Sequence, residues 1–210
     1  MRPISAAQMR EIERRAVEEF KISEDALMEH AGRSAAEQIL NYILPLAKEK
    51  REKKEIIVVC GFGNNGGDGL VCARYLLENN CNVYCYIVNN GAYKPLVMKN
   101  LKRAFFSHLS VKEIEQDLTD LKNSLQNADV IVDALLGIGA EGAPRGIFRE
   151  IINLINQSAA VKISIDVPSA FEVKPDYTYA CGFIKEGCAP ETCGKIKILD
   201  IGLPEELKNN

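Results

Sequence analysis

The feature that most constrains the fold is a short apolar run that leads directly into a glycine-rich loop. Residues 56–60, Ile-Ile-Val-Val-Cys, have the pattern of a strand buried on both faces of a parallel sheet. Residues 61–69 then read Gly-Phe-Gly-Asn-Asn-Gly-Gly-Asp-Gly, and Leu70, Ala73 and Leu77 follow at helical spacing. The sequence therefore predicts a strand, a tight glycine loop and a helix, which is the basic unit of an α/β fold.

The rest of the chain alternates between the same two patterns. Two helices are expected first: one begins near Ser5, which has Gln8 at capping-box spacing, and the other runs from Ser23 to Pro45. Further strands are predicted at 83–88, 130–135 and 161–167, and further helices at 96–109 and 147–155. Two late strands are expected at 177–183 and 195–199, and an antiparallel pairing at this edge of the sheet is one alternative for them. This order predicts a doubly wound, mostly parallel sheet with helices on both faces.

Length and charge narrow the class of protein. With 210 residues, of which 47% are hydrophobic, residues 1–210 are expected to form a single domain. A net charge of -3 and a pI near 5.6 argue against nucleic acid as a partner. The sequence has no apolar stretch near the ~20 residues that span a bilayer and no secretory signal at its start, so we expect no membrane association.

The cysteines indicate a reducing compartment. The seven cysteines are odd in number and have no paired CxxC spacing of the kind that builds zinc sites. We interpret them as reduced thiols, and we expect a cytoplasmic protein, with a mitochondrial pool left open. Pairing or metal binding by Cys188 and Cys193 is the alternative.

The glycine loop only partly matches a nucleotide-binding motif. Gly61, Gly63 and Gly66 satisfy GxGxxG. A dinucleotide dehydrogenase also needs a carboxylate at the end of the next strand, where this chain has two asparagines at 89–90. No Gly-Lys-Ser/Thr follows for a phosphate loop.

In place of these features the loop carries two adjacent amides and a carboxylate. These are Asn64, Asn65 and Asp68, interleaved with glycines that let a ligand approach the backbone. The composition suits polar groups and a hard cation. The alternative is a plain turn in which Asp68 favours the start of the following helix.

Five segments in the same order resemble one family. They are residues 27–32, 58–74, 132–139 together with 144–146, 164–169 and 199–204. Together they are similar to the NAD(P)H-hydrate epimerase (YjeF N-terminal) family. The resemblance implies a Rossmann-like three-layer αβα sandwich, commonly a homodimer, that interconverts the R and S forms of hydrated NADH and NADPH. A separate S-specific dehydratase would then complete the repair.

The resemblance also implies the residues of the site. Asp166 and two loops would contact the substrate; the loop residues are Asn64, Asn65, Gly66, Gly67, Asp68, Gly137, Ile138, Gly139, Ala140, Glu141, Gly142 and Ala143. Asn65, Asp133 and Ser169 would hold one potassium ion per subunit. Each of these segments follows a strand, so the fold could bring them to one edge of the sheet. The alternatives are a strand-end cap for Asp133, a turn former for Ser169 and a surface strand end for Asp166.

Epimerisation needs a group that moves a proton. A plausible path expels the ring hydroxyl to give an iminium and readmits water on the other face, and one acid–base residue could serve both directions. Our hypothesis assigns this role to Asp166, so that Asp166→Asn should abolish activity and leave folding intact. Lys185 is the second candidate for proton transfer or phosphate binding, and its alternative is an exposed, solvated lysine.

Two departures from the family pattern bear on activity. Ala170 stands where the family has glycine; if the position needs positive φ, alanine strains the loop by roughly 1 kcal/mol and could displace Ser169. The segment 170–198 is also shorter than expected. A catalytically weakened scaffold or dimerisation module is therefore the second hypothesis, and an NAD-dependent dehydrogenase is the third.

Overall fold

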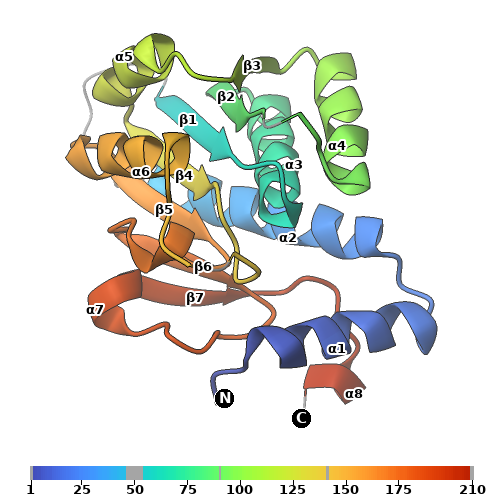
Figure 1. Ribbon diagram of the computed structural model, residues 1–210. Coiled ribbons are helices and arrows are strands. Elements are labelled where there is room, and N and C mark those ends of the chain that lie inside the picture. Colours follow the sequence, from blue (N-terminus) through green and yellow to red (C-terminus); the bar gives the residue numbers. More distant parts are fainter. Residues whose placement is uncertain (1, 46–53, 90, 141, 209–210) are drawn as a thin grey trace.

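A seven-stranded parallel sheet forms the centre of the computed structural model, which describes residues 2–45, 54–89, 91–140 and 142–208 (Figure 1). Its strands are β1 (Glu55–Cys60), β2 (Asn82–Val88), β3 (Ser110–Ile114), β4 (Val130–Ala134), β5 (Val161–Ile165), β6 (Tyr177–Cys181) and β7 (Lys195–Leu199). The strand order is β3-β2-β1-β4-β5-β6-β7, and every neighbouring pair is parallel. The α/β prediction is confirmed, and the antiparallel edge is wrong: β6 and β7 continue the parallel order.

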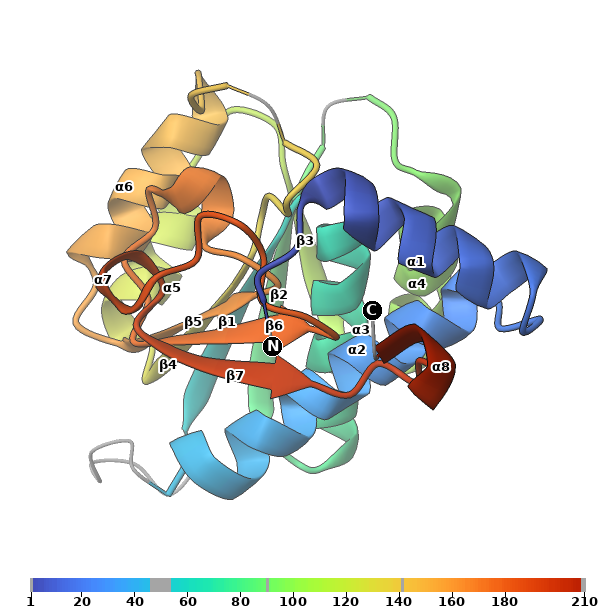
Figure 2. The same ribbon diagram turned by 90° about the horizontal axis from the view of Figure 1, so that it is seen from below.

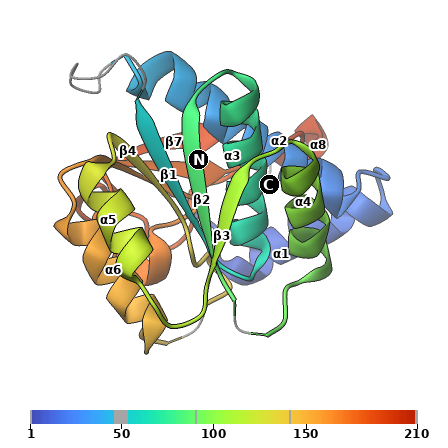
Figure 3. The same ribbon diagram turned by 90° about the horizontal axis from the view of Figure 1, so that it is seen from above.

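Helices cover both faces of this sheet (Figure 3). The α-helices are α1 (Ala6–Glu18), α2 (Glu24–Gln38), α3 (Asn64–Glu78), α4 (Pro95–Phe106), α5 (Thr119–Asn127), α6 (Ile147–Gln157), α7 (Pro190–Cys193) and α8 (Glu205–Lys208). A π-helical turn, η1 (Ile39–Ile43), extends α2, and a 3-10 turn, η2 (Ser169–Phe171), follows β5. Helices α2, α3 and α4 pack on one face, and α5 and α6 pack on the other.

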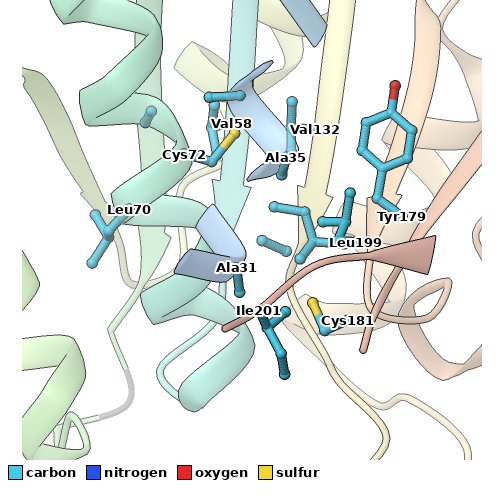
Figure 4. Packing of buried hydrophobic residues seen from close by; sticks show 14 of the residues in the cluster. Ala31, Ala35, Val58, Leu70, Cys72, Val132, Tyr179, Cys181, Leu199 and Ile201 are labelled. Atoms are coloured by element: carbon cyan, nitrogen blue, oxygen red, sulfur yellow. The ribbon is translucent and has the colours of Figure 1, made fainter. Parts of the chain in front are cut away.

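The alternation of side chains along β1 explains the three layers. Ile56 and Val58 point into the core shared with α2, α3 and α4, whereas Ile57 and Val59 point into the core shared with α5 and α6. Figure 4 shows the first of these cores, where Val58 lies between the helices and the neighbouring strands. Because a strand of this kind has apolar neighbours on both faces, nearly all of its residues are apolar.

The two helices expected at the start of the chain are both present. Ser5 and Gln8 form a reciprocal capping box, with the Gln8 amide N donating to Ser5 Oγ over 3.2 Å and the Ser5 amide N donating to Gln8 Oε1 over 2.8 Å. Ser23 Oγ caps α2 by accepting from the Ala26 amide over 3.1 Å. The chain enters α1 beside the late strands and leaves it for α2, which runs across one face of the sheet (Figure 2).

Strand β3, helix α5 and the short helical elements η2, α7 and α8 were not predicted. Strand β3 lies at the edge of the sheet with mostly solvent-facing residues, so its sequence lacks a continuous apolar run. Helix α5 is nine residues long and buries only Leu121 and Leu125 within them. None of the helices in the described part of the chain combines the length and apolar content that crossing a bilayer requires.

Candidate active site

The site forms where the strand order reverses. The chain moves outward from β1 to β2 and β3 on one side and to β4 through β7 on the other, so loops leaving β1 and β4 diverge and open a crevice at their carboxyl ends. Residues 61–63 follow β1, and residues 135–146 follow β4. The glycine loop therefore lies at the position where open parallel sheets bind their ligands.

Two glycines of this loop are required by close backbone contacts. A Cβ atom on Gly61 would lie 1.9 Å from the Leu135 carbonyl oxygen, and one on Gly66 would lie 1.8 Å from the Gly61 carbonyl oxygen. At Gly63, by contrast, a Cβ atom would meet nothing within 4 Å. Gly61 and Gly66 thus bring the loop after β4 and the first turn of α3 against the end of β1.

A cleft of about 400 Å³ opens at this edge. It is lined by residues from six parts of the chain: Ala6, Met9, Arg10 and Glu13 of α1; Phe62, Gly63, Asn64, Asn65 and Asp68; Lys94; Leu135, Leu136, Gly137, Ile138, Gly139 and Ala140; Asp166; and Cys181. The structure thus brings Asn64, Asn65 and Asp68 together with Asp166 at one cleft, while their contacts with a substrate stay a prediction.

The predicted loop residues divide between this cleft and a second cavity. The first four, 137–140, line the cleft, while Ala140, Gly142 and Ala143 line an adjoining cavity that also contains Arg145. Glu141 lies outside the described residues. The cavities share Phe62, Leu136 and Ala140, so a long ligand could extend from one to the other.

Gly66 and Gly67 do not line the cleft. A Cβ atom on Gly66 would face Gly61, and one on Gly67 would lie 2.6 Å from the Met28 side chain of α2. Both glycines belong to the contact between α3 and its neighbours. Their predicted contact with the substrate remains a prediction, limited to backbone atoms.

Asp166 is held in an unusual conformation at the mouth of the cleft. Its φ is 69°, in the left-handed region that aspartate adopts more readily than most residues, and its amide N donates to the Tyr179 carbonyl over 2.8 Å. Its carboxylate forms an ion pair with Lys185. Strained backbone of this kind is common at functional sites.

Lys185 is fully buried, so its interpretation as a solvated lysine is wrong. The side chain is 0% exposed, and Nζ donates to the Cys181 carbonyl over 2.5 Å besides pairing with Asp166. Burial lowers the pKa of this ammonium, but the charge and hydrogen bond of Asp166, together with Cys181 and Glu13, outweigh that effect and raise the pKa above its ordinary value. Lys185 remains a cation behind Asp166 and does not line the cleft.

Two further carboxyl groups share the cleft with Asp166. Burial raises the pKa of Asp68 well above its usual range, and the charges of Asp166 and Glu13 add to this effect. Burial also raises the pKa of Glu13, with a further contribution from Asp166. Asp68 and Glu13 thus favour their protonated forms beside the Asp166–Lys185 ion pair.

Asp133 and Ser169 lie together beneath the cleft. Both are 0% exposed. Asp133 accepts hydrogen bonds from Ser169 Oγ at 2.5 Å, the Ser169 amide at 3.0 Å, Ser164 Oγ at 2.7 Å and the Leu135 amide at 3.2 Å. Burial raises the pKa of Asp133 in spite of these bonds. Among the described residues no basic side chain forms an ion pair with it.

The Asn65 amide supplies the observation that tests the proposed cation. Both its Oδ1 and Nδ2 atoms are buried without a hydrogen-bond partner in the described structure, which is costly for an amide. A buried carboxylate without a counter-ion carries a similar cost. A hard monovalent cation would take the Asn65 Oδ1 atom and the Asp133 carboxylate as ligands, so Asn65, Asp133 and Ser169 fit such an ion, while Asn65 Nδ2 still needs an acceptor. The described residues contain no cluster of three or more His, Cys, Asp or Glu side chains that could hold a metal ion.

Ala170 has the positive φ that its position required. Its backbone lies at φ 54° and ψ 15°, and Phe171 follows with φ 54°. The strain has not displaced Ser169, whose hydroxyl still lies 2.5 Å from Asp133.

We expect Ala170→Gly to stabilise the protein slightly. Glycine adopts this backbone without the steric cost of roughly 1 kcal/mol, although it loses methyl packing and gains freedom in the unfolded chain. The net gain in the free energy of unfolding should be about 0.5 kcal/mol, measured by urea denaturation. The control Ala7→Gly, in the first turn of α1, should lower it instead. Equal losses in both variants would show that Ala170 is not strained.

Sequence reasoning missed the contribution of α1. Ala6, Met9, Arg10 and Glu13 line the cleft only because the first helix packs beside the ends of strands far along the sequence. Their spacing of i, i+3, i+4 and i+7 marks one helical face, which was the available signal. Nothing in the local sequence indicated that this face covers a site.

Known proteins of one family are similar to this chain. The family model described as "YjeF-related protein N-terminus" matches residues 24–187. A protein of Elusimicrobium minutum named "NAD(P)H-hydrate epimerase" is 55% identical, over 99% of this chain and 98% of that protein. A "Bifunctional NAD(P)H-hydrate repair enzyme Nnr" of Thermofilum pendens is 31% identical over 99% of this chain, which spans only 41% of that longer protein.

A solved structure shows the same fold. The crystal structure of the yeast protein YNL200c superposes with a TM-score of 0.77, at 24% sequence identity, over 88% of this chain and 82% of that one. At this level of identity the match concerns the fold alone. The family model and the 55% identical relative carry the assignment further. The chain therefore belongs to the family described as YjeF-related protein N-terminus.

Proposed function

We propose that this protein is an NAD(P)H-hydrate epimerase, an isomerase that interconverts the R and S forms of hydrated NADH and NADPH. The observation that carries the proposal is the polar cleft at the edge where the strand order reverses. Asp166 lies there with Asn64, Asn65 and Asp68. The 55% identical relative bears this enzyme's name over nearly its full length. Arg10 and Lys94 add positive charge to the cleft, which suits the phosphates of a dinucleotide.

The site can carry out the reaction by moving a proton. The hydrated ring has a hydroxyl on a carbon next to nitrogen. Loss of that hydroxyl as water leaves an iminium, and a water that adds to the opposite face gives the other epimer. Asp166 lines the cleft, and Lys185 fixes it from behind, so its carboxylate is positioned to take up or give a proton. Asn64, Asn65 and Asp68 would hold the ring and its carboxamide through hydrogen bonds.

Asn65, Asp133 and Ser169 would hold a potassium ion. When bound, the ion would supply positive charge beneath the cleft floor and fix the glycine loop. Because Asn65 lines the cleft while Asp133 and Ser169 lie beneath it, these residues link the ligand loop to the ends of β4 and β5. The donor set contains one carboxylate and neutral oxygens, which suits a hard cation of low charge.

We expect potassium to raise the melting temperature. Replacing tetramethylammonium chloride by potassium chloride at equal ionic strength should stabilise the folded state, by about 2.7 kcal/mol at 100 times the dissociation constant. For a domain of this size that corresponds to roughly 5–10 °C. Asp133→Asn should remove the difference between the two salts. An identical melting temperature of the unaltered protein in both salts would count against the cation site.

The potassium effect should also depend on pH. The pKa of Asp133 is raised in the fold, so without a cation the folded state holds this proton more tightly than the unfolded state does. Stability then falls as pH rises from the unfolded pKa through the folded one. Potassium binds the ionised form, so its stabilising effect should grow over the same rise in pH.

A catalytically weakened scaffold is the second candidate function. The strained Ala170, beside Ser169 of the proposed cation site, is the observation in its favour. The retained Asn64, Asn65, Asp68, Asp133 and Asp166 argue for catalysis. A dehydrogenase is not supported, because that class needs a carboxylate after β2 to bind the ribose. In this chain Asn89 follows β2, and its Nδ2 donates to Glu113 Oε2 over 2.8 Å.

We further propose a homodimer that acts with a separate NAD(P)H-hydrate dehydratase. The longer relatives named bifunctional repair enzymes support such a pairing of activities. All seven cysteines are free, which supports a reducing compartment such as the cytoplasm. Analytical ultracentrifugation would test the dimer.

A coupled assay tests the proposed function. An S-specific dehydratase consumes only the S form, so the R form disappears at the slow rate of spontaneous epimerisation. Adding this protein should speed consumption of the R pool in proportion to its concentration. With a scaffold or a dehydrogenase, the R form would be consumed at the same rate as without the protein.

A further inference from the structure

The first helix presents one face to the cleft, and a single acidic residue stands on it. Ala6, Met9, Arg10 and Glu13 all line the cleft. The start of α1 is fixed to the loop that carries Lys185: the Ile4 amide donates to the Ile184 carbonyl over 2.9 Å, and the Glu186 amide donates to the Ile4 carbonyl over 2.9 Å. The helix is therefore tied to the Asp166–Lys185 pair and is a fixed wall of the site.

Glu13 differs from the other acidic residues of this helix. Glu11 and Glu18 pair with Arg14, and Glu19 pairs with Arg15, all on the exposed side. In the described part of the chain the Glu13 carboxyl group, which is partly buried, has no ion pair or hydrogen bond. A partly buried carboxyl group without a partner has lost hydration without gaining a hydrogen bond, and a ligand in the cleft would supply that bond.

Several charged groups face Glu13 from the elements packed around it. They are Arg10 on its own helix, Glu24 at the start of α2, Asp68 on α3, Asp166 after β5 and Lys185 before α7. Burial raises the pKa of Glu13, and the charges of Asp166 and Glu24 raise it further, whereas Lys185 and Arg10 lower it; the net direction is upward. Glu13 therefore favours its protonated form in a cleft that it shares with the Asp166–Lys185 ion pair.

We propose that Glu13 is a second catalytic acid–base residue, which acts on the face of the substrate ring opposite to Asp166. The proposal rests on the proposed function. Protonated Glu13 gives its proton to the departing hydroxyl oxygen, the carbon–oxygen bond breaks, and the ring nitrogen lone pair forms the iminium. A water then bonds to the carbon from the other face, its proton goes to the Asp166 carboxylate, and the nitrogen regains its lone pair.

Atoms and charges balance in this sequence. One water leaves and one enters, and the only lasting change is that a proton has moved from Glu13 to Asp166. The reverse epimerisation returns that proton and restores the starting state. Each residue is thus an acid in one direction and a base in the other, which an epimerase needs because it must accept both forms of its substrate.

The test compares Glu13→Gln with the matched control Glu11→Gln on the exposed side of the same helix. We expect Glu13→Gln to lower kcat by roughly 10²- to 10⁴-fold with little change in KM, and Glu11→Gln to leave both unchanged. The unaltered enzyme should show a bell-shaped dependence of kcat on pH. Glu13→Gln should lose the alkaline limb, which reports the proton held by the acid.

The outcomes separate the two proposals. If the unaltered protein does not epimerise, the proposed function fails; if it does and Glu13→Gln keeps full kcat with both limbs, only the role of Glu13 fails. Loss of the alkaline limb in Asp68→Asn but not in Glu13→Gln would transfer the role to Asp68 and overturn the proposal. If glutamine prevents folding, Glu13→Asp decides: the proposal predicts a reduced kcat that retains both limbs, whereas full kcat contradicts it.

Discussion

Asp166→Asn should reduce epimerisation by roughly 10²- to 10⁴-fold, the usual contribution of a general acid–base group. The carboxylate lines the cleft, and the backbone conformation that presents it, with φ at 69°, is one that asparagine also tolerates. The local geometry should therefore survive while the proton-transfer group is lost. The measurement is kcat in the coupled assay, with Asp176→Asn, which alters another loop carboxylate outside the cleft, as control.

The structure changes the expectation that this variant folds normally. Lys185 is 0% exposed, so removing the charge of Asp166 leaves a buried ammonium without its partner. Breaking a buried pair in this way costs about 3–5 kcal/mol. The double variant Asp166→Asn/Lys185→Met removes both charges and should recover most of that stability while staying inactive. Activity in the double variant would show that Asp166 is not the proton-transfer group.

Gly66→Ala should be the most destabilising single methyl addition in the glycine loop. The added Cβ would lie 1.8 Å from the Gly61 carbonyl oxygen, and this contact is with backbone, which cannot rotate away. Relief requires separating α3 from the end of β1, so we expect a loss of about 3 kcal/mol or more in the free energy of unfolding. In a domain of this size that corresponds to a fall of roughly 6–12 °C in melting temperature.

Gly63→Ala is the matched control for this prediction. It adds the same methyl group three residues earlier, where nothing lies within 4 Å, at a φ of -90° that alanine adopts freely. Gly63 is the N-cap of α3, so the change should cost less than about 1 kcal/mol. Calorimetric melting of the two variants decides the matter. Similar losses in both would mean that the close approach of Gly66 to Gly61 does not hold the loop in place.

Much of the fold follows from burial on both faces of the sheet. Strand β1 is buried between two helical layers, so residues 56–60 form a continuous apolar run that could be recognised without other information. Strands β4 and β5 are mostly apolar and β-branched, with Asp133, Lys162 and Ser164 as the polar exceptions. Strand β3 and helix α5 could not be recognised in this way, because an edge strand and a short surface helix carry little apolar pattern. The direction of β6 and β7 is set by crossovers, which no local pattern reveals.

The same reasoning explains which parts of the site were predictable. Asp133 and Asp166 stand at or just after the carboxyl ends of strands, and parallel topology brings such positions to one edge. Glu13 and Lys185 were not placed there, since their position depends on the pairing of Ile4 with Lys185 across most of the chain. That pairing turns an N-terminal helix and a late loop into two walls of one cleft.

The most direct test of the account is an approach to equilibrium from both sides. Pure R-hydrate and pure S-hydrate of NADH are incubated separately with the protein, without any dehydratase, and the two epimers are separated by chromatography over time. The account predicts that both samples reach the same R-to-S ratio far faster than protein-free samples, and that Asp166→Asn removes the acceleration. Rates equal to the spontaneous ones from either side would contradict it.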